Sequence, residues 1–308
     1  MCVWWSYELI KNKMREQLPT YSKIRNRKKP PTLFHYTTPI GLLGISHSKN
    51  IWATDIRFLN DKKELHHILD ITHSILDDFY KVDDNPEKIR ELNYDFIEGL
   101  RINLLREWSS EVYVASFTEE GDILSQWRGY CPNGGFSIGF HYDMLSQIAT
   151  KNHSFLERCV YDLEIQKQMI EELLVSYSKK YVKVMKDNNH RNIDELGNRI
   201  LDEFLIALFA WAPMFKHKSF KEEKEWRIVC SRFYGIKQEM KFRANELNIV
   251  PYIEISLCQS EEDINFKEIF IGPAVTNQSS KDAVSRLLEK NRMPEHSIIF
   301  SNAPYRSG

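Results

Sequence analysis

The chain has 308 residues, enough for one large domain or two small ones, each with a hydrophobic core. Its 42 Lys and Arg residues balance 43 Asp and Glu residues, so no overall charge draws the protein to nucleic acid or to an anionic membrane. A hydrophobic content of 42% with only 12 Gly and 11 Pro excludes disordered, collagen-like and low-complexity proteins.

The cysteines and the apolar segments indicate the compartment. Five cysteines are scattered without a C-x-x-C pair, which argues against a disulfide framework and a structural zinc site and fits a reducing cytoplasm. The N-terminal residues 1–18 lack the pattern of a signal peptide. The most apolar segment, 204–215, is too short for a membrane span and predicts a buried helix. We expect a cytoplasmic protein with no membrane insertion and no metal.

The first 31 residues are predicted to lie outside the main domain. Apolar residues from Trp4 to Leu18 recur at helical spacing and predict a short amphipathic helix that Pro19 ends. The basic segment 23–31 then predicts an exposed linker. A single domain is expected over residues 32–308.

The first half of this domain alternates short strands with helices. The sequence predicts a strand at 33–36, a helix at 39–49 and a strand at 51–53. Apolar residues then recur every three or four positions over 62–108, which predicts a helical insertion. Strands are predicted at 112–118 and, after a Pro-Asn-Gly-Gly turn, at 135–140.

The second half contains another long helical block. A second helical insertion is predicted over 163–215. The elements predicted after it are strands at 226–230, 252–255 and 269–271, a helix at 281–290 and a strand at 297–301. Long helical blocks between the strands exclude a regular βαβ alternation and predict an α+β fold. The sequence contains neither a Rossmann fingerprint nor a P-loop, so a nucleotide would have to bind in another way.

Three segments combine rings, hydroxyls and charges as ligand sites do. His35 ends the first strand and is followed by a helix whose N-terminal amides can bind an anion. Residues 52–54 and 58–61 mix flat apolar side chains with Asn and Asp. Residues 116–130 place rings beside Arg128. Taken alone, each segment fits core packing or an ordinary surface better than it fits a ligand site.

The fourth segment carries two carboxylates. If residues 223–227 enter a strand, period two places Glu223, Glu225 and Arg227 on one face. Two like charges in that arrangement repel, so the pair is costly unless a function or a cation requires it. An exposed strand end flanked by basic residues would also tolerate it.

Together, these segments resemble the bacterial proteins catalogued as domain of unknown function 2971, which are often encoded near phage-defence genes. Members carry the motifs L-[YF]-H-Y-T, W-A-T, F-[LM]-N-D, S-F-S followed by W and Y, and K-x-x-x-F-x-x-E-x-E-W-R. The corresponding residues of this sequence are 33–37, 52–54, 58–61, 116–130, with Thr118 in place of Ser at the third position of S-F-S, and 216–227. The resemblance extends from about Leu33 to Arg306 and excludes the N-terminal helix and linker.

That family is in turn similar to the ADP-ribosyltransferase fold, in the branch with a His-Tyr-Glu triad that includes diphtheria-type toxins. The resemblance implies a split mixed or antiparallel sheet core with large helical insertions and NAD as the substrate. It implies that His35 binds the adenosine-side ribose, that aromatic rings hold the nicotinamide and that Glu225 is the catalytic carboxylate. Glu223 would orient the acceptor or pair with Arg227, and we favour the pairing.

The resemblance assigns a full set of residues to the site. The NAD-binding residues would be His35, Tyr36, Thr37, Trp52, Thr54, Asn60, Asp61, Ser116, Phe117, Trp127, Arg128 and Tyr130, with Glu225 and Glu223 as the catalytic pair. Cleavage of the nicotinamide–ribose bond passes through an oxocarbenium-like transition state, which a fixed carboxylate stabilises without a metal.

The expected function is therefore that of an NAD-dependent ADP-ribosyltransferase. It would act as a toxin or antiphage effector on a nucleic acid or protein, and an antitoxin or another defence partner would restrain it. Two alternatives on the same fold are an NAD glycohydrolase and a non-catalytic module that binds a nucleotide or partner. A nucleic-acid-binding protein that uses the basic linker is a further alternative.

Overall fold

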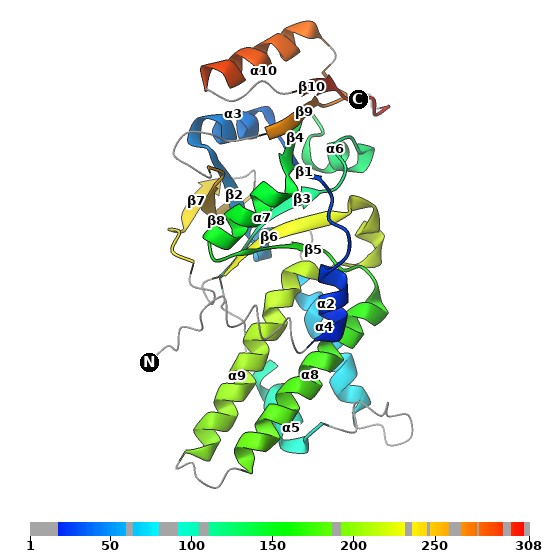
Figure 1. Ribbon diagram of the computed structural model, residues 1–308, viewed down its shortest axis with the longest axis vertical. Coiled ribbons are helices and arrows are strands. Elements are labelled where there is room, and N and C mark those ends of the chain that lie inside the picture. Colours follow the sequence, from blue (N-terminus) through cyan, green and yellow to red (C-terminus); the bar gives the residue numbers. More distant parts are fainter. Residues whose placement is uncertain are drawn as a thin grey trace.

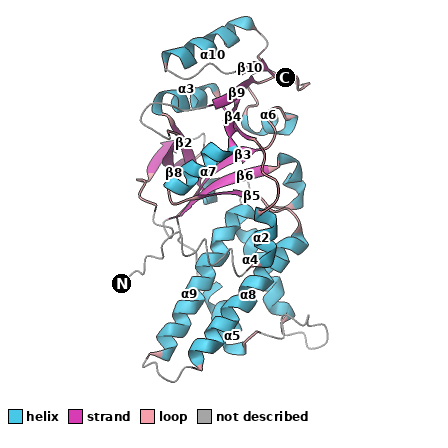
Figure 2. Cartoon of the chain, viewed as in Figure 1, coloured by secondary structure: helices cyan, strands magenta, loops and turns pink. Residues whose placement is uncertain are grey.

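A computed structural model of the chain describes residues 18–59, 64–79, 92–104, 111–186, 192–231, 236–244, 247–258, 266–275, 277–291 and 297–304. One half of the molecule is an open, mostly antiparallel sheet, and the other half is a group of packed helices (Figures 1 and 2). The mixed organisation of sheet and helices agrees with the predicted class in this general form.

The strands are β1 (Thr32–Thr37), β2 (Asn50–Asp55), β3 (Val112–Thr118), β4 (Phe136–His141), β5 (Phe155–Arg158), β6 (Glu225–Ser231), β7 (Lys241–Ala244), β8 (Ile249–Ser256), β9 (Phe266–Ile271) and β10 (Ser297–Phe300). The α-helices are α2 (Pro19–Arg25), α3 (Pro39–Ser48), α4 (Glu64–Asp78), α5 (Tyr94–Leu104), α6 (Leu124–Tyr130), α7 (Tyr142–Lys151), α8 (Leu163–Met185), α9 (Ile193–Trp211) and α10 (Gln278–Lys290). The 3-10 turns are η1 (Ile56–Phe58), η3 (Ala212–Met214) and η4 (Lys218–Glu223). Each strand predicted from the sequence overlaps an observed one, whereas β5, β7, α6 and α7 were not predicted.

The sheet divides at β3. One edge of β3 pairs with β6 along its whole length, from Val112 opposite Ser231 to Thr118 opposite Glu225. The other edge is shared, because β1 pairs with it only at Thr118 and β2 only at its opposite end. One branch continues from β1 through β4 and β9 to β10, and the other continues from β2 through β8 to β7. A fork therefore opens between β1 and β2.

Helices cover one face of the sheet. Strand residues alternate between faces, and the covered face contributes a core that includes Leu33, Ile138, Phe140, Ile228, Ile253 and Ile269. Leu145 of α7 and Leu288 of α10 pack into the same core. Trp226 lies on this face with its ring 5.4 Å from that of Tyr142, as expected for a residue between Glu225 and Arg227. The opposite face of β6 carries the charged residues Glu225 and Arg227, followed by the buried Val229.

The helical half has a separate core built from α2, α4, α5, α8 and α9. Phe204, Leu208 and Trp211 of α9 are buried there, which confirms a buried helix over 204–211 of the apolar segment, whereas residues 212–214 form the turn η3. None of the helices in the described part of the chain combines the length and apolar character needed to cross a membrane.

The region predicted as helix and linker is arranged differently. Residues 1–17 lie outside the described part, and Pro19 begins α2 instead of ending a helix. Proline suits a first helical turn because its missing N–H would have no partner there. Tyr21 and Ile24 are buried in the helical core, and the Oγ1 of Thr20 donates to Glu172 of α8 at 2.6 Å. Part of the predicted linker is therefore a packed helix.

Candidate functional site

A cleft of about 670 Å³ lies along the fork between β1 and β2. Its walls include His35, Tyr36 and Thr37 of β1, Trp52 and Thr54 of β2, Ser116 of β3, Tyr130 of α6, Glu223 of η4 and Arg227 of β6. A smaller pocket of about 50 Å³ shares His35, Ser116, Tyr130 and Glu223 with this cleft and adds Glu225. The fork thus gathers candidates from distant parts of the sequence.

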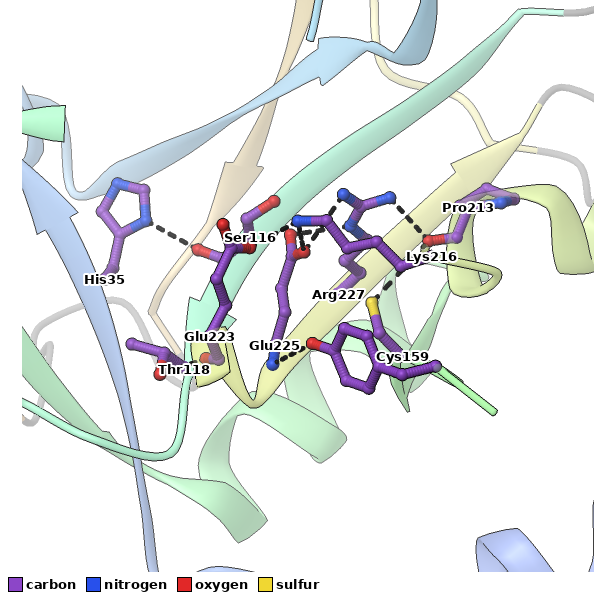
Figure 3. A network of polar contacts seen from close by, with 10 residues as sticks. His35, Ser116, Thr118, Cys159, Pro213, Lys216, Glu223, Glu225 and Arg227 are labelled. Atoms are coloured by element: carbon purple, nitrogen blue, oxygen red, sulfur yellow. Dashed lines mark hydrogen bonds and ion pairs between the residues drawn. The ribbon is translucent and has the colours of Figure 1, made fainter. Parts of the chain in front are cut away.

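A tight turn presents the two carboxylates. Turn η4 ends at Glu223, Lys224 adopts the left-handed conformation with φ 44°, and β6 begins at Glu225. The prediction that Glu223 and Glu225 share one strand face was therefore wrong, because the left-handed residue separates them. The turn still directs both side chains to Lys216, whose Nζ lies 2.5 Å from an oxygen of Glu223 and 2.6 Å from one of Glu225 (Figure 3).

Glu225 is held by several partners. Arg227 binds it with two nitrogens, Nε at 2.7 Å from Oε1 and Nη2 at 3.2 Å from Oε2. The backbone N–H of Glu225 donates to the hydroxyl of Tyr161 at 2.8 Å. Glu225 and Arg227 are only 4% and 2% exposed. The charged partner found for Glu223 is Lys216, whereas the sequence suggested Arg227, and Arg227 instead binds the carboxylate two residues before it on the strand.

The two carboxylates differ electrostatically. Burial would raise the pKa of Glu225, but the charges of Arg227 and Lys216 outweigh it and hold this pKa at about 2. Burial raises the pKa of Glu223 above its ordinary value. The Glu223 side chain is 18% exposed, against 5% for Glu225. The cluster therefore combines a fixed negative charge with a second carboxylate that accepts a proton more readily.

His35 is oriented by β3. Its Nδ1 lies 2.9 Å from the carbonyl oxygen of Ser116, which can only accept, so Nδ1 donates and Nε2 is the acceptor in the neutral ring. Burial lowers the pKa of His35, so the ring is neutral at pH 7. A neutral His in this orientation suits a ligand hydroxyl group.

The predicted aromatic residues have different roles. Tyr130 lines both the cleft and the pocket, and burial, together with the charge of Glu225, raises its pKa to about 12, so its hydroxyl stays a donor. Trp127 is fully buried, its indole N–H donates to Asp122 at 2.7 Å, and its ring packs on Tyr36 at 4.7 Å. Trp127 therefore supports the wall behind Tyr36 and does not line the cleft.

The other predicted residues divide into three groups. Those that line the cleft or pocket are Tyr36, Thr37, Trp52, Thr54, Ser116 and Phe117. Arg128 is exposed on α6 and is not among the lining residues. Asn60 and Asp61 lie outside the described residues. Within the described ranges, no group of three or more His, Cys, Asp or Glu side chains is arranged to hold a metal ion.

The sequence interpretation missed several residues of the site. They are Lys216, Tyr161, Gln126 and Arg243. Lys216 is the first residue of the K-x-x-x-F-x-x-E-x-E-W-R motif, so the motif contained a usable signal. Arg243 lies on β7, a short and largely exposed strand without hydrophobic alternation, and had no such signal.

Comparisons with known proteins bear on one part of the chain. No curated protein and no solved structure matches the chain. Residues 126–228 match the model of a family described as a protein of unknown function, DUF2971. The matched segment runs from α6 to β6 and contains Tyr130, Lys216, Glu223 and Glu225. The match supports the resemblance to the DUF2971 family over the segment that carries both carboxylates.

Proposed function

We propose that the protein cleaves NAD between nicotinamide and ribose and transfers ADP-ribose to a nucleic acid or protein. One observation carries the proposal. His35, Tyr130, Glu223 and Glu225 come from three distant segments of the chain, and all four line the same small pocket. The resemblance in sequence implies these residues for NAD binding and cleavage.

The pocket offers a consistent set of chemical roles. The bond between the ribose carbon and the nicotinamide nitrogen breaks, and its electron pair neutralises the pyridinium ring. The ribose becomes an oxocarbenium ion, which the ionised Glu225 stabilises. An acceptor nucleophile then bonds to the ribose carbon and loses a proton, for which Glu223, with its raised pKa, is the base. His35 accepts a hydrogen bond from a ribose hydroxyl.

The experiment is nicotinamide release from NAD by purified protein, with and without added RNA, DNA or cell lysate. Glu225→Gln should reduce release by about 100-fold, because it removes the charge that stabilises the transition state. Glu222→Gln is the matched control, since Glu222 is exposed on η4 and lines neither the cleft nor the pocket. Absence of both release and NAD binding in the parent would refute the proposal.

The same assay separates the related activities. Release that does not rise with any acceptor would assign an NAD glycohydrolase. NAD that binds without cleavage would assign a binding module. A role as a toxin or antiphage effector follows from the genomic setting of the resembling family. It predicts that expression of the parent arrests bacterial growth and that expression of Glu225→Gln does not.

A further inference from the structure

A positively charged side chain, that of Arg243, lies in the cleft on the branch of the sheet that runs from β2 to β7. Arg243 of β7 reaches past the intervening strand β8, and its Nη2 donates to the hydroxyl of Thr54 on β2 at 2.9 Å. Its guanidinium carbon lies 5.3 Å from the centre of the Trp52 ring. All three side chains line the cleft. Arg243 is therefore held in one position by a hydroxyl and a ring.

No carboxylate in the described part of the chain binds Arg243. A guanidinium has five N–H donors, and the bond to Thr54 uses only one. Burial lowers the pKa of Arg243, because nearby negative charge does not fully offset the loss of water around the guanidinium group. Lys241, two residues earlier on β7, contrasts with it, because its Nζ pairs with Glu254 at 2.8 Å.

Neighbouring groups add to the preference for an anion. Thr38, which caps α3, and Ile40 and Gly41 of its first turn line the same cleft, and the N-terminus of a helix carries a partial positive charge. Trp52 and Phe58 also line the cleft, and they are 39% and 38% exposed. This part of the cleft therefore offers positive charge beside flat apolar surface.

We propose that Arg243 forms a subsite for a phosphoryl group within the cleft. Guanidinium groups bind phosphoryl oxygens through paired N–H donors, and a side chain already held by Thr54 loses little freedom on binding. The subsite belongs to the cleft of the proposed function and rests on that proposal only for the identity of the ligand. If NAD is the substrate, its pyrophosphate binds here while a ribose contacts His35.

The test is calorimetric binding of ADP and of adenosine, which lacks the phosphoryl groups. Arg243→Gln should weaken ADP binding by roughly tenfold or more, because charge-assisted hydrogen bonds are lost, and should change adenosine binding by less than about twofold. Arg243→Lys keeps the charge and should retain part of the affinity for ADP. Lys241→Gln is the control on the same strand and should bind ADP as the parent does. Thermal unfolding of each variant checks that the fold is intact.

The outcomes separate this subsite from the catalytic proposal. Equal ADP affinity in the parent and Arg243→Gln, or no ADP binding by the parent, would overturn the subsite even if nicotinamide is released. If both Arg243 variants unfold at lower temperature, ADP should still protect the parent against thermal unfolding and protect Arg243→Lys more than Arg243→Gln. Equal protection of the two variants by ADP, or greater protection of Arg243→Gln, would overturn the proposed subsite. ADP binding that depends on Arg243 in a protein that releases no nicotinamide would support the subsite and reject the catalytic proposal.

Discussion

Lys216 explains how two carboxylates lie side by side in a buried place. Burial would lower the pKa of Lys216, but the negative charge of Glu225 outweighs this and raises it, so the ammonium ion stays charged. Its Nζ contacts both Glu223 and Glu225 within 2.6 Å. The repulsion expected between the two carboxylates is thus relieved by a cation of the chain itself. The chain's own residues therefore fix the positions of both carboxylates.

The low pKa of Glu225 predicts a pH dependence of stability. The folded-state pKa of about 2 lies below the ordinary value of 4.5, so the ionised carboxylate stabilises the fold above pH 4.5. This contribution is lost as the pH falls from 4.5 towards 2. The raised pKa of Glu223 acts in the opposite sense and at higher pH, because its stabilising effect is lost as the pH rises through its folded value. The two carboxylates therefore change the stability of the fold over different pH ranges.

Urea unfolding at several pH values would measure this contribution. The free energy of unfolding of the parent should fall between pH 4.5 and 2, and the slope should be smaller in Glu225→Gln. Glu222→Gln should keep the parent's slope. An unchanged slope in Glu225→Gln would show that the Glu225 carboxylate is not held by its cationic partners.

At the level of elements, the turn between η4 and β6 decides where Glu223 points. Lys224 has φ 44° and ψ 45°, its backbone N–H bonds the carbonyl of Lys221 at 3.3 Å, and the hydroxyl of Thr118 donates to the carbonyl of Glu223 at 2.7 Å. A left-handed conformation costs a non-glycine residue about 1 kcal/mol. The strained residue lies between the two carboxylates, where the turn brings both of them to the ammonium group of Lys216.

Substitution of Lys224 tests the turn. Lys224→Gly should leave the free energy of unfolding unchanged or raise it by up to about 1 kcal/mol, because glycine adopts positive φ freely. Lys224→Pro should lower it by more than about 1 kcal/mol, because proline fixes φ near −65° and has no N–H. If nicotinamide release is present, it should survive the glycine change and fall with the proline change. Equal stability of the two variants would contradict the importance of the turn.

Across the whole molecule, the helical half supports the site in the sheet. The amide nitrogen of Gln166 on α8 lies 2.5 Å from the carbonyl oxygen of Val160 and 3.0 Å from that of Lys216. The Nη1 of Arg227 donates to the carbonyl of Pro213, next to the end of α9, at 2.7 Å. The second helical insertion thus delivers Lys216 to the carboxylates, so it is part of the site's scaffold.

The N-terminal helix α2 also belongs to this scaffold, and its truncation should show it. Leu18, Tyr21 and Ile24 are buried in the helical core. Removal of residues 1–31 would delete them and expose the apolar surface against which they pack. Each buried apolar side chain contributes about 1.5–3 kcal/mol, so the truncated protein should unfold at markedly lower temperature.

A charge-only variant is the matched control for that truncation. Combined Gln substitution of Lys23, Arg27 and Lys28, which are exposed, should leave the melting temperature close to that of the parent. It also tests the basic segment for nucleic-acid binding without disturbing the core. An unchanged melting temperature after truncation would contradict the packing of α2.

The sequence by itself determined the elements with strong periodicity and the motif residues. Strands such as β3 and β6 and the long helices α8 and α9 follow from local hydrophobic patterns, which depend on neighbouring residues alone. The motifs identified His35, Tyr130, Glu223 and Glu225, which line one pocket. The elements β5 and β7 are only four residues long and carry too few apolar positions for a periodic signal.

Only the tertiary structure decided which residues meet. The shared edge of β3 opens the fork, the left-handed Lys224 turns Glu223 towards Lys216, and the strand order brings Arg243 to Thr54. In the structure, Trp127 is buried behind the cleft wall, although its motif suggested a ligand contact. Contacts between residues far apart in the chain depend on strand pairing and side-chain packing, which a local sequence pattern does not encode.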